Sequence, residues 1–236
     1  MTPAASNRTT VSDFFDDFHK FTAGDWTDTN DEGTGAVAVK TSAGSCGGWL
    51  SVATAGAAND YHVISSATVF EFLAGRPLFA EWRIKVTEAA ANSAHFFVGL
   101  TDTLTGGFLA DSTGLPPASY RGAVIYKPAG AAFLCVESAN GSAKSTTPNV
   151  FTFTSGGIIT LGLHFDPGDA NGGRVQFYVN GSGIYQNAAM NRDDNVRRHL
   201  LQLSGMTPMS LAFGIKASTS AAETMLVDYV QASVSR

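Results

Sequence analysis

The acidic side chains of the expected strands are the first residues to test for chemistry, because two facing carboxyl groups can cleave a glycosidic bond. Glu81 has the clearest strand context, but Trp82 and Arg83 follow it and no second acid comes two or five residues later. The other strand acids also stand alone; they are Glu71, Glu88 and Glu137. The sequence therefore favours exposed strand acids and predicts no glycoside-cleaving pair.

Histidines and serines lack the spacing that metal binding or nucleophilic catalysis requires. No two histidines form a His-x-x-x-His pair, no serine sits in a Gly-x-Ser-x-Gly turn, and no glycine run leads into a phosphate loop. The histidines are His19, His62, His95, His164 and His199, and the serines nearest to glycines are Ser45, Ser155 and Ser182. We therefore predict that the protein is not an enzyme and that it uses no metal or other cofactor.

Aromatic side chains in or beside the expected loops are the remaining lead to a function. An exposed ring can stack on a sugar face or anchor a protein interface. The alternative is that these rings close the edge of the core, although 16 phenylalanines are already present to fill it. The predicted carbohydrate or partner contacts are Trp26, Trp49, Tyr61, Tyr120 and Tyr185.

Charge and polarity exclude several classes of partner. The net charge is −5, charged residues make up 15%, and polarity comes from hydroxyl and amide side chains. Such a surface suits carbohydrate contact or packing in an assembly, and without a Lys/Arg cluster it predicts no nucleic-acid binding. No apolar run is long enough for a membrane span, and no signal segment is visible. Cys135 is expected to be a buried free thiol, with a Cys46–Cys135 disulfide as the alternative.

Alternation of apolar and polar residues predicts the elements that carry these side chains. Residues 78–87 alternate strictly, which places one face of a strand on a core. Residues 172–185 also alternate, and Asn180-Gly181 within them predicts a β-hairpin. Strands recur along the chain without intervening helices, so we expect an all-β fold, an antiparallel two-sheet sandwich.

Some segments depart from this alternation. The phenylalanines of residues 11–21 fit a helix or a strand, and we favour a strand, while residues 139–149 are expected to form a polar connection. One short helix is expected near residues 193–203, because Asp193 or Asp194 can cap it. Its apolar face would carry Val196, Leu200 and Leu203. Residues 1–10 are expected to form a flexible N-terminal arm, and residues 11–236 a single β-sandwich domain.

Two short motifs resemble a known superfamily. The residues that carry the resemblance are Val175, Phe177, Tyr178, Val179, Asn180 and Gly181 in one strand, and Leu226, Val227, Asp228, Tyr229 and Val230 in the last. In their order along the chain, these segments resemble the concanavalin A-like lectin/glucanase jelly roll. The resemblance covers roughly residues 11–235 and implies a jelly-roll β-sandwich.

That superfamily implies two kinds of site. Its glucanases carry a Glu-x-Asp-x-x-Glu run on one strand, which this sequence lacks. Its lectins bind sugar beside Ca²⁺ held by loop carboxylates and amides. Two acidic loops come nearest to such a calcium site. One contains Asp25, Asp28, Asp31 and Glu32, and the other contains Asp166, Asp169 and Asn171. Neither has a full calcium-loop pattern, so solvated turn residues are the favoured interpretation.

Within the superfamily, the opening DFFDDF and the turn GLTDT resemble virion proteins of tailed bacteriophages. This resemblance implies synthesis in the host cytoplasm, a homo-oligomer, and contact with capsid or other virion proteins. Our main hypothesis is therefore a non-enzymatic virion structural protein, a capsid decoration or fibre domain. The alternative is a lectin-like module that binds surface glycans through loop aromatics, with or without calcium. A third hypothesis, a divergent glycoside hydrolase or lyase, requires two acids that face each other across one sheet.

Overall fold

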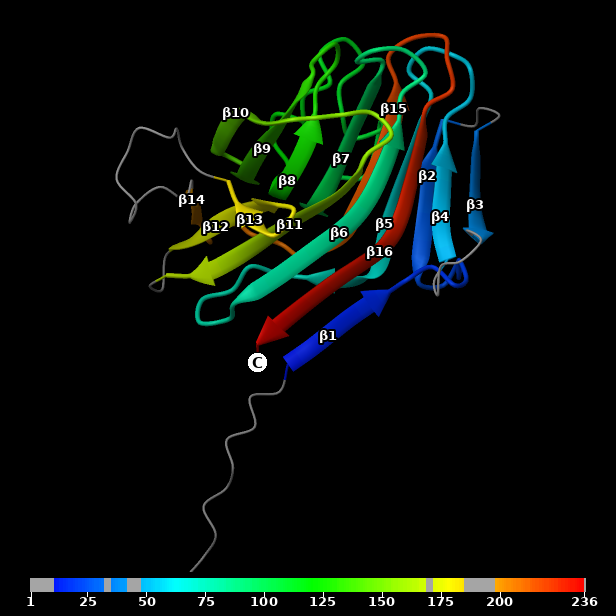
Figure 1. The fold of residues 1–236 in the computed structure, drawn as a ribbon. Coiled ribbons are helices and arrows are strands. Elements are labelled where there is room, and N and C mark those ends of the chain that lie inside the picture. The colour runs from blue at the N-terminus through cyan, green and yellow to red at the C-terminus, as the bar shows by residue number, and fades with distance from the viewer. Residues whose placement is uncertain (1–10, 32–34, 42–47, 169–171, 185–197, 236) are drawn as a thin grey trace, which may run out of the picture.

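The computed structural model describes residues 11–31, 35–41, 48–168, 172–184 and 198–235, and these residues form two antiparallel sheets (Figure 1). Sheet A has nine strands, β1 (Val11–Asp16), β3 (Ala36–Thr41), β4 (Gly48–Ala53), β6 (Leu78–Thr87), β11 (Ile158–Pro167), β12 (Gly172–Val179), β13 (Ser182–Gly183), β14 (Arg198–Gln202) and β16 (Thr224–Ser235). Sheet B has seven, β2 (Trp26–Asn30), β5 (Tyr61–Phe70), β7 (Ala94–Thr101), β8 (Arg121–Lys127), β9 (Phe133–Asn140), β10 (Lys144–Thr152) and β15 (Met209–Ala217). The predicted all-β, two-sheet antiparallel architecture is confirmed.

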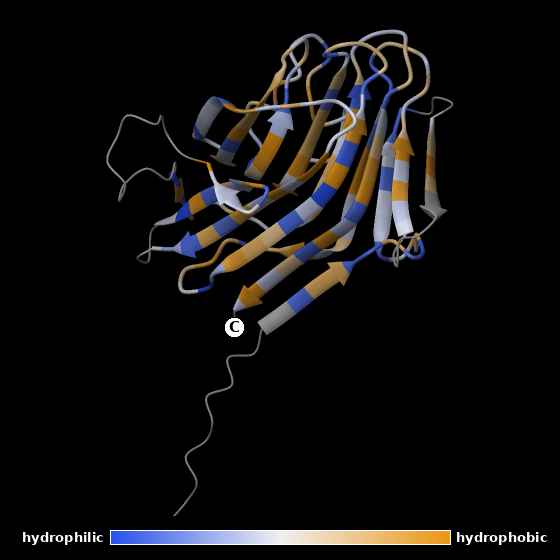
Figure 2. Ribbon diagram, viewed as in Figure 1, coloured by the Kyte–Doolittle hydropathy of each residue, from blue (hydrophilic) through white to orange (hydrophobic). Residues whose placement is uncertain are grey.

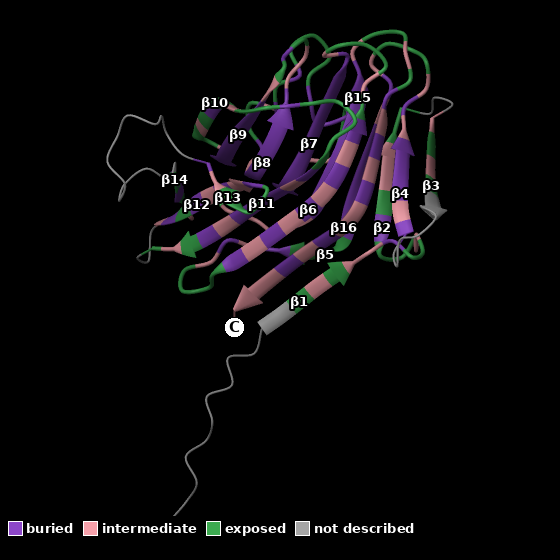
Figure 3. Ribbon diagram, in the orientation of Figure 1, coloured by how far each residue is buried: buried purple, intermediate pink, exposed green. Residues whose placement is uncertain are grey.

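The apolar faces of the two sheets pack against each other and form the main core. In β6, Trp82 and Ile84 are fully buried, whereas Arg83 between them is half-buried on the opposite face. Figure 2 shows this alternation as bands of hydropathy along β6 and β16, and Figure 3 shows the matching alternation of burial. Burial of alternate apolar side chains from both sheets is what holds the layers together.

The two ends of the described chain lie side by side in sheet A. β1 pairs with β16 over Val230–Ser235, and β4 pairs with the same side of β16 over Thr224–Val227. Where the partner changes, the register of β16 against β6 shifts between Val227 and Tyr229. This β-bulge contains Asp228, and a bulge re-aims the side chains beside it. The strand interpretation of residues 11–16 is therefore confirmed.

The hairpin prediction at Asn180-Gly181 is confirmed. Both residues have positive φ, 51° and 74°, as a tight hairpin turn requires. Asn180 accepts a 3.0 Å hydrogen bond from the backbone N–H of Thr160 through its side-chain Oδ1. β13 then returns beside β12.

The predicted short helix near residues 193–203 is wrong. Residues 193–197 lie outside the described part of the chain, but Arg198–Gln202 form β14, which pairs with β12. His199 and Leu201 point inward, and the His199 ring lies 5.2 Å from the ring of Phe177. The predicted helical face included Leu200, but Leu200 is 75% exposed, so the inward residues follow a period of two, and the hydrogen-bonding edge of β12 sets it.

Residues 139–149, expected to be a polar connection, are largely strand. β10 starts at Lys144 and pairs with β9, with a register irregularity between Thr147 and Phe151. Its polar residues are compatible with a strand because β10 is the edge of sheet B. The predicted arm, residues 1–10, lies outside the described residues.

The outer face of sheet B is covered by the connection between β7 and β8, residues 102–120. Phe108 and Leu109 from this connection are buried against Phe97 of β7 and Val124 of β8. Every residue of β7 is buried as a result, so this central strand of sheet B is covered on both faces. We call residues 104–115 the roof of sheet B. Among the described residues there is no helix with the length and apolarity that a membrane crossing requires.

Candidate functional site

The outer face of sheet A is the open polar surface of the sandwich. On sheet B the roof buries the strands, whereas on sheet A the outward side chains of β6, β12 and β16 are half-buried or exposed and mostly polar or aromatic. A binding site needs reachable side chains of fixed position, and strands hold them more rigidly than loops do. The candidate site therefore lies on this surface.

Five residues from five adjacent strands lie in one line across sheet A. In the strand registers, Phe15 of β1 is opposite Gln231 of β16, which is opposite Glu81 of β6. Glu81 is opposite Gly162 of β11, which is opposite Tyr178 of β12. All five belong to the outward alternate positions of their strands. We call this line the transverse row.

Glu81 is held rigidly in the middle of the transverse row. Its Oε1 accepts a 2.6 Å hydrogen bond from the Tyr229 hydroxyl and a 3.0 Å bond from Gln231 Nε2. Burial, followed by the hydrogen bond and charge of Glu81, raises the pKa of Tyr229 to about 12. The phenol thus stays protonated and donates throughout the neutral range. Two donors on one oxygen leave the other, Oε2, directed toward the neighbouring strand.

Gly162 lies beside that oxygen. A Cβ placed on Gly162 would stand 3.8 Å from Glu81 Oε2 and 3.4 Å from the backbone oxygen of Ala80, which is ordinary contact. Gly162 is itself buried, so the groups that the row offers to a ligand here are the Glu81 carboxylate and, two strands away, the half-buried Tyr178 side chain. An oxygen acceptor and an aromatic group suit a sugar hydroxyl and a sugar ring face.

Aromatic rings mark both ends of the transverse row. Phe15 is 61% exposed, and its ring lies 6.0 Å from the Tyr229 ring at an interplanar angle of 31°. Tyr178 stands half-buried at the opposite end. The exposed ring of Phe15 is therefore within reach of a ligand on this face.

A second polar group lies next to the row. The Arg83 guanidinium pairs with Asp228 in the bulge of β16, and its Cζ lies 5.9 Å from the centre of the Trp49 ring. Because Arg83 is neutralised by Asp228, this group adds hydrogen-bonding capacity and an aromatic ring without adding net charge.

The sequence-predicted contact residues do not gather at one place. Trp49 alone joins the face of sheet A, whereas Trp26 is 1% exposed in the main core and donates from Nε1 to Asp16 Oδ2 at 2.6 Å. Tyr120 is buried under the roof, where burial and the nearby charge of Glu137 raise its pKa well above the ordinary value. Tyr61 is half-buried beneath the Lys216 ammonium, 5.4 Å from its ring centre. Tyr185 lies outside the described residues.

The structure supplies three site aromatics that were not predicted, Phe15, Tyr178 and Tyr229. A signal for Tyr178 was present, since it occupies a polar position in the alternation of β12. Phe15 and Tyr229 needed the pairing of the first and last strands, which no local pattern reveals.

The strand acids occupy different environments. Glu137 is buried, where it accepts from Thr146 at 2.6 Å and pairs with Lys144 at 2.9 Å, and Glu88 pairs with buried Lys127 at 2.9 Å. Glu81 shares the outer face of sheet A with Asp228, which the sequence did not predict. Asp228 is the ion-pair partner of Arg83.

The acidic loops do not form a calcium cage among the residues that the structure describes. No group of three or more His, Cys, Asp or Glu side chains converges as metal ligands there. Asp28 instead accepts from His62 Nδ1 at 3.0 Å, and Asp31 is exposed. Glu32, Asp169 and Asn171 lie outside the described residues. Cys135 is a buried free thiol, as predicted.

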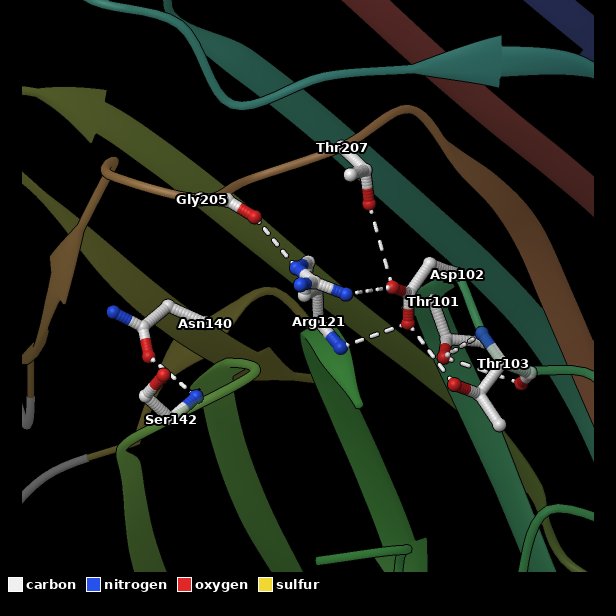
Figure 4. A network of polar contacts seen from close by, with 8 residues as sticks. All are labelled: Thr101, Asp102, Thr103, Arg121, Asn140, Ser142, Gly205 and Thr207. Atoms are coloured by element: carbon white, nitrogen blue, oxygen red, sulfur yellow. Dashed lines mark hydrogen bonds and ion pairs between the residues drawn. The ribbon is translucent and has the colours of Figure 1, made fainter. Parts of the chain in front are cut away.

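A second polar network connects several loops around Arg121, the first residue of β8 (Figure 4). Arg121 donates from its backbone N–H and from Nη1 to the two oxygens of Asp102, at 2.8 and 3.0 Å, and from Nε to the backbone oxygen of Gly205. Thr103 and Thr207 add hydroxyl bonds to the same carboxylate, at 3.0 and 3.3 Å. The bonds from Arg121 and Thr207 join segments that are far apart in the sequence, so the role of the group is to anchor the loops.

Beneath the roof, His95 and Lys216 lie opposite each other in the β7–β15 pair. Lys216 is almost fully buried and donates to the backbone oxygen of Leu109 at 3.1 Å and to Asp111, so it clamps the roof to sheet B. His95 is fully buried, and neither ring nitrogen has a hydrogen-bond partner. Burial, then the charges of Lys216 and Lys127, lower the pKa of His95 to about 4.

No protein-family model and no curated protein matches the sequence. The fold, in contrast, has many solved counterparts. Peanut lectin in complex with a peptide superposes with a TM-score of 0.59 at 10% identity, covering 96% of this chain and 98% of the lectin. An endo-β-1,4-glucuronan lyase from the fungus Trichoderma reesei superposes with a TM-score of 0.58 at 12% identity, covering 93% and 94%.

A protein of unknown function from Shewanella oneidensis superposes with a TM-score of 0.57 at 15% identity, covering 96% of this chain and 87% of that protein. Most of the similar structures are lectins or carbohydrate recognition domains, which are not enzymes, and the lyase is an exception. The expected concanavalin A-like, lectin-like sandwich is confirmed as the fold. Identities this low establish the fold alone.

Proposed function

We propose that this protein is a carbohydrate-binding, lectin-like domain that binds sugar on the outer face of sheet A. The observation that carries the proposal is the transverse row, in which the Glu81 carboxylate lies between the aromatic side chains of Phe15 and Tyr178. Carbohydrate binding requires flat apolar rings against sugar ring faces and fixed polar groups for the hydroxyls. The row supplies both on rigid strands.

The lectin-like fold supports the proposal as an analogy, and the composition agrees with it. The chain is poor in charge and rich in hydroxyl side chains, which suits a neutral ligand. On this face the carboxylate is positioned by Tyr229 and Gln231, so no metal is needed to orient it. We therefore expect binding to be independent of calcium.

A glycan array followed by calorimetry tests the proposal. The full chain should bind a restricted set of glycans equally with and without a chelator. The double variant Phe15→Ala/Tyr178→Ala should lose at least tenfold in affinity, whereas Phe151→Ala, which removes an exposed phenylalanine from sheet B, should not. If the double variant still binds, the site lies elsewhere. If no glycan on the array is bound, with or without calcium, carbohydrate binding is rejected.

The virion role predicted from the sequence pattern, with homo-oligomerisation and capsid contact, stays a prediction. Solution mass tests its first requirement: a homo-oligomer is expected for a capsid decoration or fibre domain. A monomer with no affinity for a capsid shell would count against it and would leave the carbohydrate proposal unaffected.

A further inference from the structure

His95 of β7 is a fully buried polar residue beneath the roof. Among the described residues, neither nitrogen of its ring has a hydrogen-bond partner. His95 points to the outer face of sheet B, as Phe97 does, because alternate residues of a strand share a face. A neutral imidazole tolerates such a position better than a charged one, because burial of an unpaired charge costs far more than burial of an unpaired dipole.

The residue directly opposite His95 is the lysine that holds the roof to the sheet. Lys216 faces His95 in the β7–β15 pair, and its side chain is almost fully buried. Its ammonium donates to the backbone oxygen of Leu109 at 3.1 Å and pairs with Asp111. Opposite residues of an antiparallel pair have Cβ atoms about 4.5–5.5 Å apart. A protonated His95 would therefore stand beside the cation on which the roof depends.

Residues suited to hinges bound the roof. Gly106, Gly107 and Phe108 at one end and Gly114 at the other have φ values from 59° to 72°. Glycine adopts this conformation at little cost, so the chain can change direction at these positions. Between them, the Gly114 backbone N–H donates to the backbone oxygen of Ala110 at 2.8 Å, which keeps the roof folded on itself. The roof is thus built to move as one unit.

The charges around His95 oppose its protonation while the roof is closed. The charged and titratable side chains near it or on the same face are Lys216 on β15, Lys127 on β8 with its partner Glu88, Asp111 in the roof, and the phenols Tyr61 on β5 and Tyr126 on β8. Burial, then the charges of Lys216 and Lys127, lower the pKa of His95 to about 4, although Asp111 acts in the opposite direction. Once the roof moves away, the imidazole regains water and its ordinary pKa of 6.5.

We propose that the roof is an acid-sensitive cover, which opens when His95 is protonated and exposes the apolar outer face of sheet B. The imidazolium and the Lys216 ammonium then both gain water, instead of sharing a buried position. The ring of Phe108, 4.4 Å from the ring of Phe97 in the closed state, leaves with the roof. This face lies on the other sheet from the proposed sugar site, so the inference does not depend on sugar binding.

The two pKa values of His95 set the size of the effect. The closed state disfavours the protonated ring, so its advantage over the open state is complete above pH 6.5 and is lost as the pH falls toward 4. Between pH 8 and pH 5, the equilibrium constant for opening should rise about 30-fold.

Labelling of a thiol in the roof measures this opening. Leu109→Cys, in a chain that also carries Cys46→Ser and Cys135→Ser, places the only thiol at a position that is 1% exposed. The bond from Lys216 is to the backbone oxygen of residue 109, so the substitution keeps it. The labelling rate with 4,4′-dithiodipyridine is divided by the rate for the urea-unfolded chain at the same pH. This ratio should rise about 30-fold from pH 8 to pH 5, and a rise of less than threefold would overturn the inference.

Three further substitutions in the same reporter chain identify the cause. His95→Gln removes the titrating ring and should abolish the rise, whereas His19→Gln, whose ring is exposed, should retain it. Lys216→Met removes the bonds to the roof and should accelerate labelling already at pH 8. A rise that persists in His95→Gln, or a Lys216→Met chain that labels no faster than its parent at pH 8, would overturn the inference.

Low concentrations of urea separate roof opening from global unfolding. Opening of a short segment exposes little surface, so the labelling rate at pH 5 should depend on urea much less than the global unfolding constant at that pH does. An equal dependence would mean that the whole sandwich unfolds when His95 is protonated, and it would overturn the proposal of a separate cover.

Discussion

The Tyr229 hydroxyl donates a 2.6 Å hydrogen bond to Glu81 Oε1 across the β16–β6 pair, at the centre of the open face of sheet A. Because Gln231 donates to the same oxygen, the carboxylate has one oxygen occupied twice and the other beside Gly162 of β11. The bond therefore positions the group on which the proposed carbohydrate site depends.

Tyr229 should ionise with a pKa of about 12, and the difference in phenolate absorbance between the wild type and Tyr229→Phe will isolate it. In Glu81→Gln the carboxylate charge is gone but the burial remains, so the pKa of Tyr229 should fall and stay above 10. Tyr229→Phe should also weaken glycan binding about fivefold to tenfold, the loss of about one hydrogen bond. An unchanged Tyr229 titration in Glu81→Gln would contradict this arrangement.

Trp26 and Trp49 should respond in opposite ways to substitution. Trp26→Phe removes a buried hydrogen bond to Asp16 and leaves a void in the main core, so we expect a loss of about 2 kcal/mol in the free energy of unfolding. Glycan affinity of the folded fraction should not change. Trp49→Ala should lower affinity and cost less than about 1 kcal/mol, because its ring is half-exposed.

Urea unfolding of the two variants, followed by calorimetry under native conditions, measures both quantities. The opposite result, a stable Trp26→Phe with impaired binding, would show that Trp26 contacts the ligand as the sequence analysis predicted.

His95 should make the protein sensitive to acid. Its pKa in the folded state is about 4 against an ordinary 6.5, so the folded state disfavours the protonated imidazole. The stability that depends on neutral His95 is complete above pH 6.5 and is lost as the pH falls toward 4, by on the order of 3 kcal/mol. Lys216 on β15, Lys127 on β8 and Asp111 in the roof are the charged groups that act on it.

The free energy of unfolding of His95→Gln should accordingly vary less between pH 6.5 and 4.5 than that of the wild type, measured by urea titration at several pH values. His19→Gln, whose ring is exposed, should reproduce the wild-type slope. Equal slopes for wild type and His95→Gln would remove His95 as the source of the acid sensitivity.

Asp102 should stabilise the protein in its ionised form. Burial alone would raise its pKa, but the bonds from the Arg121 backbone and guanidinium and from Thr103 outweigh burial and hold the pKa below the ordinary value. Because the folded-state pKa is depressed, the contribution is complete above the ordinary carboxyl pKa near 4 and is lost as the pH falls through the folded value.

Asp102→Asn should therefore cost about 1–3 kcal/mol at pH 7, and the difference from wild type should shrink below pH 4. The exposed substitution Asp25→Asn serves as the control and should cost little at either pH. A penalty for Asp102→Asn that is the same at pH 3 and pH 7 would mean that the charge of Asp102 is not what anchors the loops.

Several features of the fold were predictable because they depend on neighbours in the chain. Strict alternation in residues 78–87 predicts which side chains of β6 enter the core, since successive strand residues point to opposite faces. Asn180-Gly181 predicts a hairpin because both residue types accept positive φ. The error at residues 198–202 has a local cause as well, since a five-residue segment fits both periods until a partner strand is known.

The candidate site depended on the tertiary structure, because its residues are brought together only by strand pairing. The sequence by itself determined the class of the fold, the inward faces of the longest strands and the lack of an acid pair within one strand. Only the structure decided that Phe15, Glu81 and Tyr178 share one line, and that Trp26 is core while Trp49 is surface. Local periodicity specifies the face on which a residue lies, whereas register between distant strands specifies its neighbours on that face.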